Sequence, residues 1–235
     1  MNIKGKNIII TGGSLGIGKA TALKLINEGA NVLVTGRSHE RLSKVFKNNE
    51  VKLLSFDIGD LDNISYYANK CLDMMGGKVD VLINNAGTGV SSSIEKINKD
   101  DFLHVFNVNV FGLALLTKEI VPKMKSQKSG TIINIGSTAS LKGYRNGSIY
   151  AASKFSVRCL TQCWQAELRE YNIRVCQINP SEVTTAFGNP NRKERKEISN
   201  KLRSKEIAHA IISTIQMDDR GFVNELNVWA TNPFD

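Results

Sequence analysis

Three polar side chains near the middle of the sequence could together move a proton at a carbonyl oxygen. Tyr150 and Lys154 lie about one helical turn apart, so both project from one face of a predicted helix. At about 4 Å and an effective dielectric of about 20, an ammonium attracts a phenolate by about 4 kcal/mol. That attraction would lower the pKa of the tyrosine from ~10 to near neutrality. Together with the hydroxyl of Ser137, such a phenol could give a proton to a carbonyl or take one from an alcohol.

A glycine turn near the start of the chain predicts a binding site for a dinucleotide. Tyr-x-x-x-Lys alone is also common on solvated helices, so this second motif decides the interpretation. The apolar run 8–10 is followed at once by the glycine turn 11–18 and then by a segment with helical apolar spacing. Strand, glycine turn and helix form the context of a dinucleotide site, because the backbone can approach a pyrophosphate and the helix offers free N–H groups. A plain glycine-rich turn is the alternative for the glycines alone. The residues predicted to contact the cofactor here are Gly12, Ser14, Leu15, Gly16, Ile17 and Gly18.

The spacing of the turn, Thr-Gly followed by three residues, Gly, one residue and Gly, resembles the short-chain dehydrogenase/reductase family. Other signatures of that family follow in order over essentially the whole chain. They are Asp57-Ile58, the run Asn84-Asn85-Ala86-Gly87, Asn109 before Gly112, then Ser137, Tyr150, Lys154 and Asn179-Pro180. The resemblance implies an oxidoreductase that transfers a hydride between a nicotinamide cofactor and a carbonyl or alcohol.

The resemblance also implies the catalytic roles. Tyr150 would be the general acid in reduction and the general base in oxidation. Lys154 would lower its pKa and hydrogen-bond the nicotinamide ribose, while Ser137 would donate a hydrogen bond to the substrate oxygen. Asn109 would hold a water that links Lys154 to solvent. The alternative for Asn109 is a polar residue that caps or kinks a helix.

The end of the second predicted strand indicates which nicotinamide cofactor is used. An NAD-selective site usually has an acidic side chain here to bind the ribose 2′-hydroxyl, and this chain has Gly36. The planar, permanently charged Arg37 suits a 2′-phosphate, and Ser38 and Arg41 are close enough to assist. An ordinary exposed arginine at a helix start is the alternative. The sequence therefore predicts NADP(H) rather than NAD(H).

The remaining cofactor contacts are inferred from position in the resemblance. Asp57 and Ile58 would flank the adenine, unless Asp57 is a turn residue. The segment 85–87 would lie along the adenosine ribose, although an Asn-Ala-Gly turn can also exist for backbone reasons. The segment 180–185 would surround the nicotinamide, with Ser181 in place of the usual glycine. The residues concerned are Asn85, Ala86, Gly87, Pro180, Val183 and Thr185.

Alternation of apolar strands with helical stretches predicts an α/β fold. We expect one Rossmann-type, doubly wound domain over 1–235, with helices on both faces of a seven-stranded, mostly parallel sheet. Residues 184–204 are poor in large apolar side chains, and by resemblance they form a substrate lid, called the lid segment below. The expected strands are 7–11, 31–35, 51–56, 79–84, 130–136, 173–179 and 222–229.

Composition narrows the protein class. Hydrophobic residues make up 41% of the 235 residues, and no apolar stretch approaches the roughly 20 needed to cross a bilayer, so no membrane partner is expected. The N-terminal residues lack the apolar region of a signal peptide, which predicts a cytoplasmic protein. In a reducing cytosol the cysteines would be buried thiols, with Cys159 and Cys163 in the core or at a subunit interface. The scattered histidines predict no metal site. The remaining cysteines are Cys71 and Cys176, and the histidines are His39, His104 and His209.

The net charge of +9 is unevenly spread, because residues 192–205 hold seven basic residues against Glu194 and Glu197. Such a basic segment could attract an anionic or carrier-bound carbonyl substrate, or it could be a solvated helix with mixed charges. No motif or stacking pattern for nucleic acid accompanies it. A 3-oxoacyl-carrier-protein reductase is the runner-up, but the Val-Asp-Gly-Gly ending of those enzymes is absent. By resemblance, helices near 100–125 and 150–170 would form a homodimer face, and a homotetramer is the other expected assembly. A nucleotide-sugar epimerase would need a larger C-terminal region, and a non-catalytic NADPH sensor would have lost part of the catalytic set.

Overall fold

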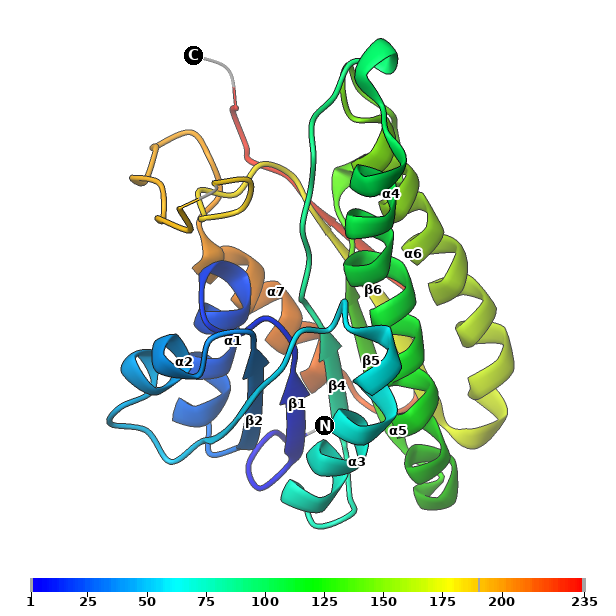
Figure 1. Cartoon of the computed structure of the whole chain (residues 1–235). Coiled ribbons are helices and arrows are strands. Elements are labelled where there is room, and N and C mark those ends of the chain that lie inside the picture. Colours follow the sequence, from blue (N-terminus) through cyan, green and yellow to red (C-terminus); the bar gives the residue numbers. More distant parts are fainter. Residues whose placement is uncertain (1, 190, 234–235) are drawn as a thin grey trace.

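The core of the protein is one seven-stranded sheet with strand order β3-β2-β1-β4-β5-β6-β7, and every neighbouring pair is parallel. The computed structural model describes residues 2–189 and 191–233, so residue 190 of the predicted lid segment and the last two residues lie outside the described part (Figure 1). The predicted strands are all found, the last one shorter than expected. They are β1 (Asn7–Ile10), β2 (Asn31–Gly36), β3 (Lys52–Ser55), β4 (Val81–Asn84), β5 (Gly130–Ile135), β6 (Ile173–Pro180) and β7 (Glu225–Val228).

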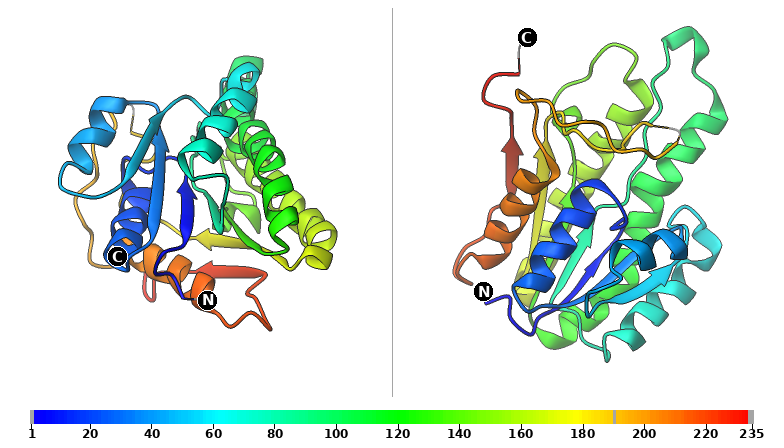
Figure 2. Two further views of the ribbon diagram at one scale, coloured as in Figure 1. Left: turned by 90° about the horizontal axis from the view of Figure 1, so that it is seen from below. Right: turned by 90° about the vertical axis from the view of Figure 1, so that its left-hand side faces the viewer.

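Helices cover both faces of the sheet, as Figure 2 shows. On one face α1 (Gly16–Asn27) packs beside α7 (Ser204–Gln216), with α2 (His39–Val45) nearby. On the other face lie α3 (Ile64–Met74), α5 (Leu113–Gln127) and α6 (Ser148–Leu168). The helix α4 (Lys99–Phe106) packs against α6 and joins α5 through the π-helical segment η3 (Asn107–Gly112). Short 3₁₀ turns complete the set: η1 (Leu61–Asn63), η2 (Ile94–Lys96), η4 (Thr138–Ser140) and η5 (Arg169–Tyr171).

Alternation along the strands fills two apolar layers. Ile8 and Val32 are register partners that point to the face of α1 and α7, whereas Ile9 and Leu33 point to the face of α3 and α5. The central strands β4 and β5 are buried at every position. A parallel sheet covered on both faces needs such continuous apolar runs, which explains why the strands could be found from the sequence. The predicted α/β, doubly wound class is confirmed.

The chain order of the strands creates the crevice in which a site can form. From β1 the chain continues to β2 on one side, whereas β4 lies on the other side of β1. Loops that leave these strands therefore separate at their carboxyl ends, where ligands bind in open α/β sheets. Figure 1 shows the lid segment above this edge of the sheet. The motifs predicted from the sequence follow the carboxyl ends of these strands or lie on the next helix.

Two composition-based expectations need correction. Cys71 and Cys176 are buried, and burial raises the pKa of each thiol to about 12, but Cys159 and Cys163 are exposed on α6, so of their two expected places the core is wrong and the subunit interface stays a prediction. All four are free thiols. The segment Lys99–Gln127 is also long and apolar enough, by length and composition alone, to cross a membrane. Within the described residues 44% of its most apolar window is buried, and its α5 part packs against α3 and β5.

Candidate active site

The glycine turn after β1 is fixed by contacts that exclude side chains. Gly12 has φ +67°, and a Cβ at this position would lie 2.7 Å from the backbone Cα of Ala86. The amide of Asn85 donates hydrogen bonds to the carbonyls of Thr11 (2.9 Å) and Gly12 (3.0 Å). The Asn-Ala-Gly segment thus has a structural role, because it ties the end of β4 to the turn. It also lines the same cavity as the turn, so the two interpretations of this segment are compatible.

The N–H groups at the start of α1 can donate hydrogen bonds to an anion. Leu15 precedes the helix in an extended conformation, and its side chain makes no capping hydrogen bond. The N–H of Gly16 instead donates to a carboxylate oxygen of Glu194, at 3.0 Å, and Glu194 belongs to the lid segment. A carboxylate is a stand-in for a phosphate oxygen at a helix N-terminus. The turn is therefore suited to the diphosphate of a dinucleotide.

Beyond the turn, the loops after β2 and β3 bring opposite charges together. The guanidinium of Arg37 lies 3.8 Å from the carboxylate of Asp57, and both side chains are about half exposed. Ser38 caps α2, because its hydroxyl accepts a hydrogen bond from the N–H of Arg41 at 3.2 Å. Asp57 also makes a turn by accepting the N–H of Gly59 at 2.9 Å. Arg37, Ser38, Asp57 and the neighbouring Ile58 all line the cavity, as predicted.

Tyr150 and Lys154 lie on the first turns of α6 and face the same cavity. The ammonium of Lys154 donates a hydrogen bond to the carbonyl of Ile135 at 2.8 Å and lies 5.8 Å from the centre of the Tyr150 ring. Burial lowers the pKa of Lys154 to about 8. The sequence therefore placed the pair correctly on one face of a helix.

The predicted pKa of Tyr150, near neutrality, is wrong for this geometry. Burial raises the pKa of Tyr150 to about 12, which exceeds the opposing effect of its hydrogen bond with Ser137. The ammonium is directed to the carbonyl of Ile135, and the low polarity around the buried phenol disfavours its charged form. At neutral pH Tyr150 is thus a protonated phenol, which can act as a proton donor.

Ser137 is held by the 3₁₀ turn that it begins. Its hydroxyl accepts the N–H of Ala139 at 3.1 Å, and the hydroxyl of Ser140 accepts the N–H of Ser137 at 3.3 Å. The same N–H also donates to the side chain of Asn179, at the end of β6, at 3.2 Å. These contacts hold the backbone and the hydroxyl of Ser137 in place near Tyr150.

Asn109 lies inside the π-helical segment η3, where it is buried. Its amide oxygen accepts the N–H of Thr88 at 2.8 Å, and its amide nitrogen donates to the carbonyl of Thr88 and the hydroxyl of Ser153. Ser153 in turn donates to the carbonyl of Tyr150 at 2.7 Å. The alternative of a helix irregularity is therefore correct for the backbone, and the side chain links η3 to the loop after β4 and to α6. Its role in holding a water stays a prediction.

The loop after β6 closes the cavity opposite the turn. The N–H of Ser181 donates to the carbonyl of Val228 at 2.8 Å, and its hydroxyl accepts the N–H of Ala230 at 3.3 Å. A serine in place of the usual glycine therefore ties this loop to the end of β7. Pro180, Val183 and Thr185 line the cavity, as the sequence predicted.

One cavity of about 870 Å³ contains nearly all of these residues. Of the described residues predicted for the site, Gly18 and Asn109 lie behind its wall, where Gly18 packs on Asn85. Several lining residues were not predicted. Two of them could have been expected from their position, because Trp229 follows the carboxyl end of β7 and Tyr144 lies between Ser137 and Tyr150. Others come from the lid segment or nearby loops and had no local signal. The main additions are Thr88, Lys142, Tyr144, Glu182, Phe187, Arg192, Arg195 and Trp229.

Within the described residues, no group of three or more His, Cys, Asp or Glu side chains is arranged to hold a metal ion.

Known proteins share both the sequence pattern and the fold. A family model described as short chain dehydrogenase matches residues 6–196, so the chain belongs to this family. An uncharacterised oxidoreductase from Staphylococcus epidermidis is 30% identical over 234 residues, covering 96% of this chain and 97% of the relative. A 3-oxoacyl-[acyl-carrier-protein] reductase from Thermotoga maritima is 35% identical over 190 residues, covering 79% of this chain and 77% of the relative.

Solved structures agree with this assignment. An alcohol dehydrogenase from Thermococcus sibiricus, complexed with 5-hydroxy-NADP, superposes with a TM-score of 0.89 at 26% identity, covering 97% of each chain. The closed form of a serine dehydrogenase complexed with NADP⁺ has a TM-score of 0.87 at 27% identity, covering 94% of each chain. The protein is thus a short-chain dehydrogenase-type oxidoreductase with NADP-binding structural neighbours.

Proposed function

We propose that this protein is an NADP(H)-dependent reductase of small carbonyl compounds. The observation that carries the proposal is the convergence of Ser137, Tyr150 and Lys154 on the cavity that also contains the glycine turn. A cofactor bound in that turn supplies the hydride. What remains for the protein is to position the carbonyl, stabilise its oxygen and provide the proton.

The residues divide these tasks. Tyr150 is a neutral phenol at physiological pH, so it can donate its proton to the carbonyl oxygen as negative charge develops there. Ser137 is held with its hydroxyl near Tyr150 and can donate a second hydrogen bond to the same oxygen. Lys154, charged below a pH of about 8, stabilises the phenolate that Tyr150 becomes after it gives up the proton. This arrangement favours carbonyl reduction.

The preference for NADP(H) is supported by the residues after β2. Gly36 has no carboxylate to accept hydrogen bonds from a ribose 2′-hydroxyl, and Arg37 and Arg41 line the adjacent cavity wall. Guanidinium groups recognise phosphates through paired hydrogen bonds. Several structural neighbours carry NADP in their solved structures, which is consistent with this preference.

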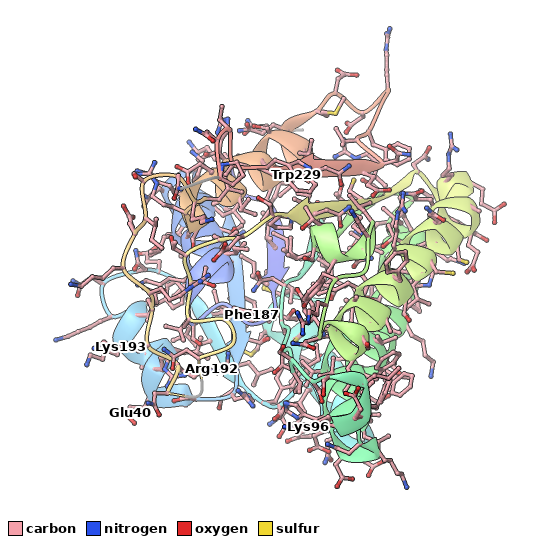
Figure 3. All side chains as sticks on the ribbon, turned by 90° about the horizontal axis from the view of Figure 1, so that it is seen from above. Glu40, Lys96, Phe187, Arg192, Lys193 and Trp229 are labelled. Carbon is pink, nitrogen blue, oxygen red and sulfur yellow. The ribbon has the colours of Figure 1, made fainter. Side chains whose placement is uncertain are left out.

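Aromatic side chains support a substrate with an apolar part. The ring of Phe187, from the lid segment, lies 5.4 Å from the ring of Tyr150, and Tyr144 and Trp229 line the same cavity. Figure 3 shows Phe187 over the centre of the site and Trp229 at the end of β7. Lys142 could bind an anionic group on the substrate. Rigid aromatic walls suit a small ketone, diketone or acyl group.

A 3-oxoacyl-carrier-protein reductase is the second candidate, favoured by the similarity to the enzyme from Thermotoga maritima. The positive charges of residues 192–205 are compatible with an acidic carrier protein. Acyl thioesters therefore belong in any substrate test.

A screen of NADPH oxidation over ketones, diketones and acyl thioesters tests the proposal. We expect turnover with at least one carbonyl class and a lower kcat/KM when NADH replaces NADPH. Preference for acyl thioesters over free ketones would establish the second candidate. Tight NADPH binding without turnover of any carbonyl would instead indicate a sensor and contradict the proposal.

We also propose that the protein forms a homodimer through α5 and α6. Phe111 just before α5 and Phe155 on α6 are each more than 40% exposed in the single chain, and Cys159 and Cys163 are exposed on the same helix as Phe155. Burial of such side chains would favour association. Sedimentation equilibrium tests this, because a monomer at all concentrations would contradict it and a homotetramer would add a second interface.

A further inference from the structure

Arg192, on the lid segment, lies with Arg37 and Arg41 around one part of the cavity. The three guanidinium groups come from distant parts of the sequence, and all three line the cavity wall. Burial and the charges of Arg37 and Arg41 lower the pKa of Arg192, while the carboxylate of Asp57 opposes this. Asp57 lies 3.8 Å from Arg37, so among these side chains it balances one of three positive charges. The cluster therefore carries an excess of positive charge, which a bound anion would offset.

The backbone of the lid segment directs Arg192 to this place. Arg192 has φ +53°, and its N–H donates to the carbonyl of Asn189 at 3.0 Å. Three residues later the guanidinium of Arg195 donates to the carbonyls of Val183 (2.7 Å) and Thr185 (3.3 Å) and forms an ion pair with Glu182 at 2.9 Å. These hydrogen bonds and the ion pair of Arg195 with Glu182 hold this part of the lid segment at the cavity.

The neighbouring lysine makes a useful contrast. Lys193 is exposed and does not line the cavity, whereas Arg192 is partly buried and does. Figure 3 shows both residues on the lid segment above α2, near Glu40. The two adjacent cations therefore differ in whether they face the site, and charge alone does not account for the position of Arg192.

We propose that Arg192 is a specificity-determining residue that the lid segment brings to the 2′-phosphate of NADP(H), completing a site with Arg37 and Arg41. This inference rests on the proposed NADP(H) preference. A 2′-phosphate carries nearly two negative charges and three acceptor oxygens, which relieve the repulsion among the three cations. A 2′-hydroxyl offers no such charge. Part of the cofactor preference would thus reside in a segment expected to cover the substrate.

Calorimetric titration of the full chain with two nucleotides isolates this contact. Adenosine 2′,5′-bisphosphate and adenosine 5′-monophosphate differ in the 2′-phosphate, so the ratio of their dissociation constants measures recognition of that group. We expect Arg192→Gln to weaken binding of the bisphosphate about tenfold, the usual loss for one charge-assisted hydrogen bond, with little change for the monophosphate. The matched control Lys193→Gln should change neither constant by more than about twofold at 0.15 M salt, where distant charges are screened.

Arg37→Gln separates the failure of this inference from the failure of the proposed cofactor. If wild-type protein prefers the bisphosphate and Arg37→Gln reduces that preference, but Arg192→Gln behaves like Lys193→Gln, the role of Arg192 is refuted and the NADP(H) preference stands. If wild-type protein binds both nucleotides equally and Arg37→Gln has no effect, the NADP(H) preference fails and the role of Arg192 fails with it. Equal weakening of both nucleotides by Arg192→Gln would also refute a contact with the 2′-phosphate.

Discussion

The two ends of the cavity are built by different kinds of contact. At the catalytic end, buried hydrogen bonds within the sheet and α6 fix the reactive groups, as when Lys154 donates to the carbonyl of Ile135. At the phosphate end the contacts involve partly exposed charged groups, as in the ion pair of Arg37 with Asp57 and the hydrogen bond from the N–H of Gly16 to Glu194 of the lid segment. Buried contacts give fixed geometry, whereas exposed ion pairs contribute about 0–1 kcal/mol each and can exchange partners. The comparison indicates that chemistry and cofactor choice can be altered separately.

The largest effect on the catalytic end alone is expected for Tyr150→Phe. Removing the phenolic hydroxyl deletes the proton donor while the ring remains, so we expect kcat to fall by about 10²- to 10⁴-fold. NADPH affinity should be nearly unchanged, because the phosphate contacts lie elsewhere in the cavity. Fluorescence titration beside steady-state kinetics measures both quantities. Full activity in this variant would exclude Tyr150 as the acid.

Gly18→Ala tests whether the glycine turn is held as rigidly as the catalytic end of the cavity. A Cβ at Gly18 would lie 2.6 Å from the carbonyl of Gly12 and would also clash with the amide of Asn85. Overpacking of this kind costs about 1–3 kcal/mol, so we expect a lower free energy of unfolding and weaker NADPH binding. Gly221→Ala is the matched control, because its Cβ would contact little beyond the end of Met217 at 3.9 Å. Equal effects of the two substitutions would show that the turn can relax.

The pH dependence of reduction reports on the buried lysine. Burial lowers the pKa of Lys154 from 10.5 to about 8, so its charge is present below pH 8 and is lost above it. We expect kcat to decline by about tenfold per pH unit above this pKa, because an uncharged amine no longer stabilises the phenolate. The titration of Lys154 would not lower activity by unfolding the protein. From pH 8 to 10.5 the unfolded state binds more protons at Lys154 than the folded state, so this group makes the free energy of unfolding rise with pH. A flat profile from pH 7 to 9.5 would contradict the assigned role.

The smallest expected effect concerns Glu194, whose carboxylate accepts the N–H of Gly16 at 3.0 Å. A phosphate bound at the start of α1 would compete for this N–H group. Glu194→Gln removes the negative charge, and we expect NADPH to bind about two- to fivefold tighter, in line with the energy of one charge at a helix N-terminus. Glu197→Gln is the control, because that carboxylate pairs with Arg203 at 3.8 Å. Unchanged or weaker binding in Glu194→Gln would show that the carboxylate does not compete.

The catalytic end could be predicted from the sequence to a greater extent than the phosphate end. Tyr150 and Lys154 are related by local helical spacing, and Ser137 and the glycine turn follow the ends of buried strands, so their positions needed no long-range information. The pKa of Tyr150 could not be predicted, because it depends on burial by the whole fold. The strands were recognised because a parallel sheet needs continuous apolar runs, although some of their limits differ, as for β7.

At the phosphate end the decisive contacts depend on the path of the lid segment. Arg192 appeared in the sequence as one of several basic residues, and nothing local distinguished it from Lys193. That distinction follows from the hydrogen bond between the N–H of Arg192 and the carbonyl of Asn189 and from the attachment of Arg195 to the backbone of the loop after β6. The exposure of Cys159 and Cys163 excludes a place in the core for them, whereas a place at a subunit interface stays a prediction.

The most direct test of the central claim is to follow the hydride itself. NADPH deuterated at the transferred position is incubated with wild-type protein and the best carbonyl from the screen, and the product is analysed by mass spectrometry. The proposed reaction predicts one deuterium on the alcohol carbon and loss of that product in Tyr150→Phe. Oxidation of NADPH without deuterium in the alcohol would contradict the account.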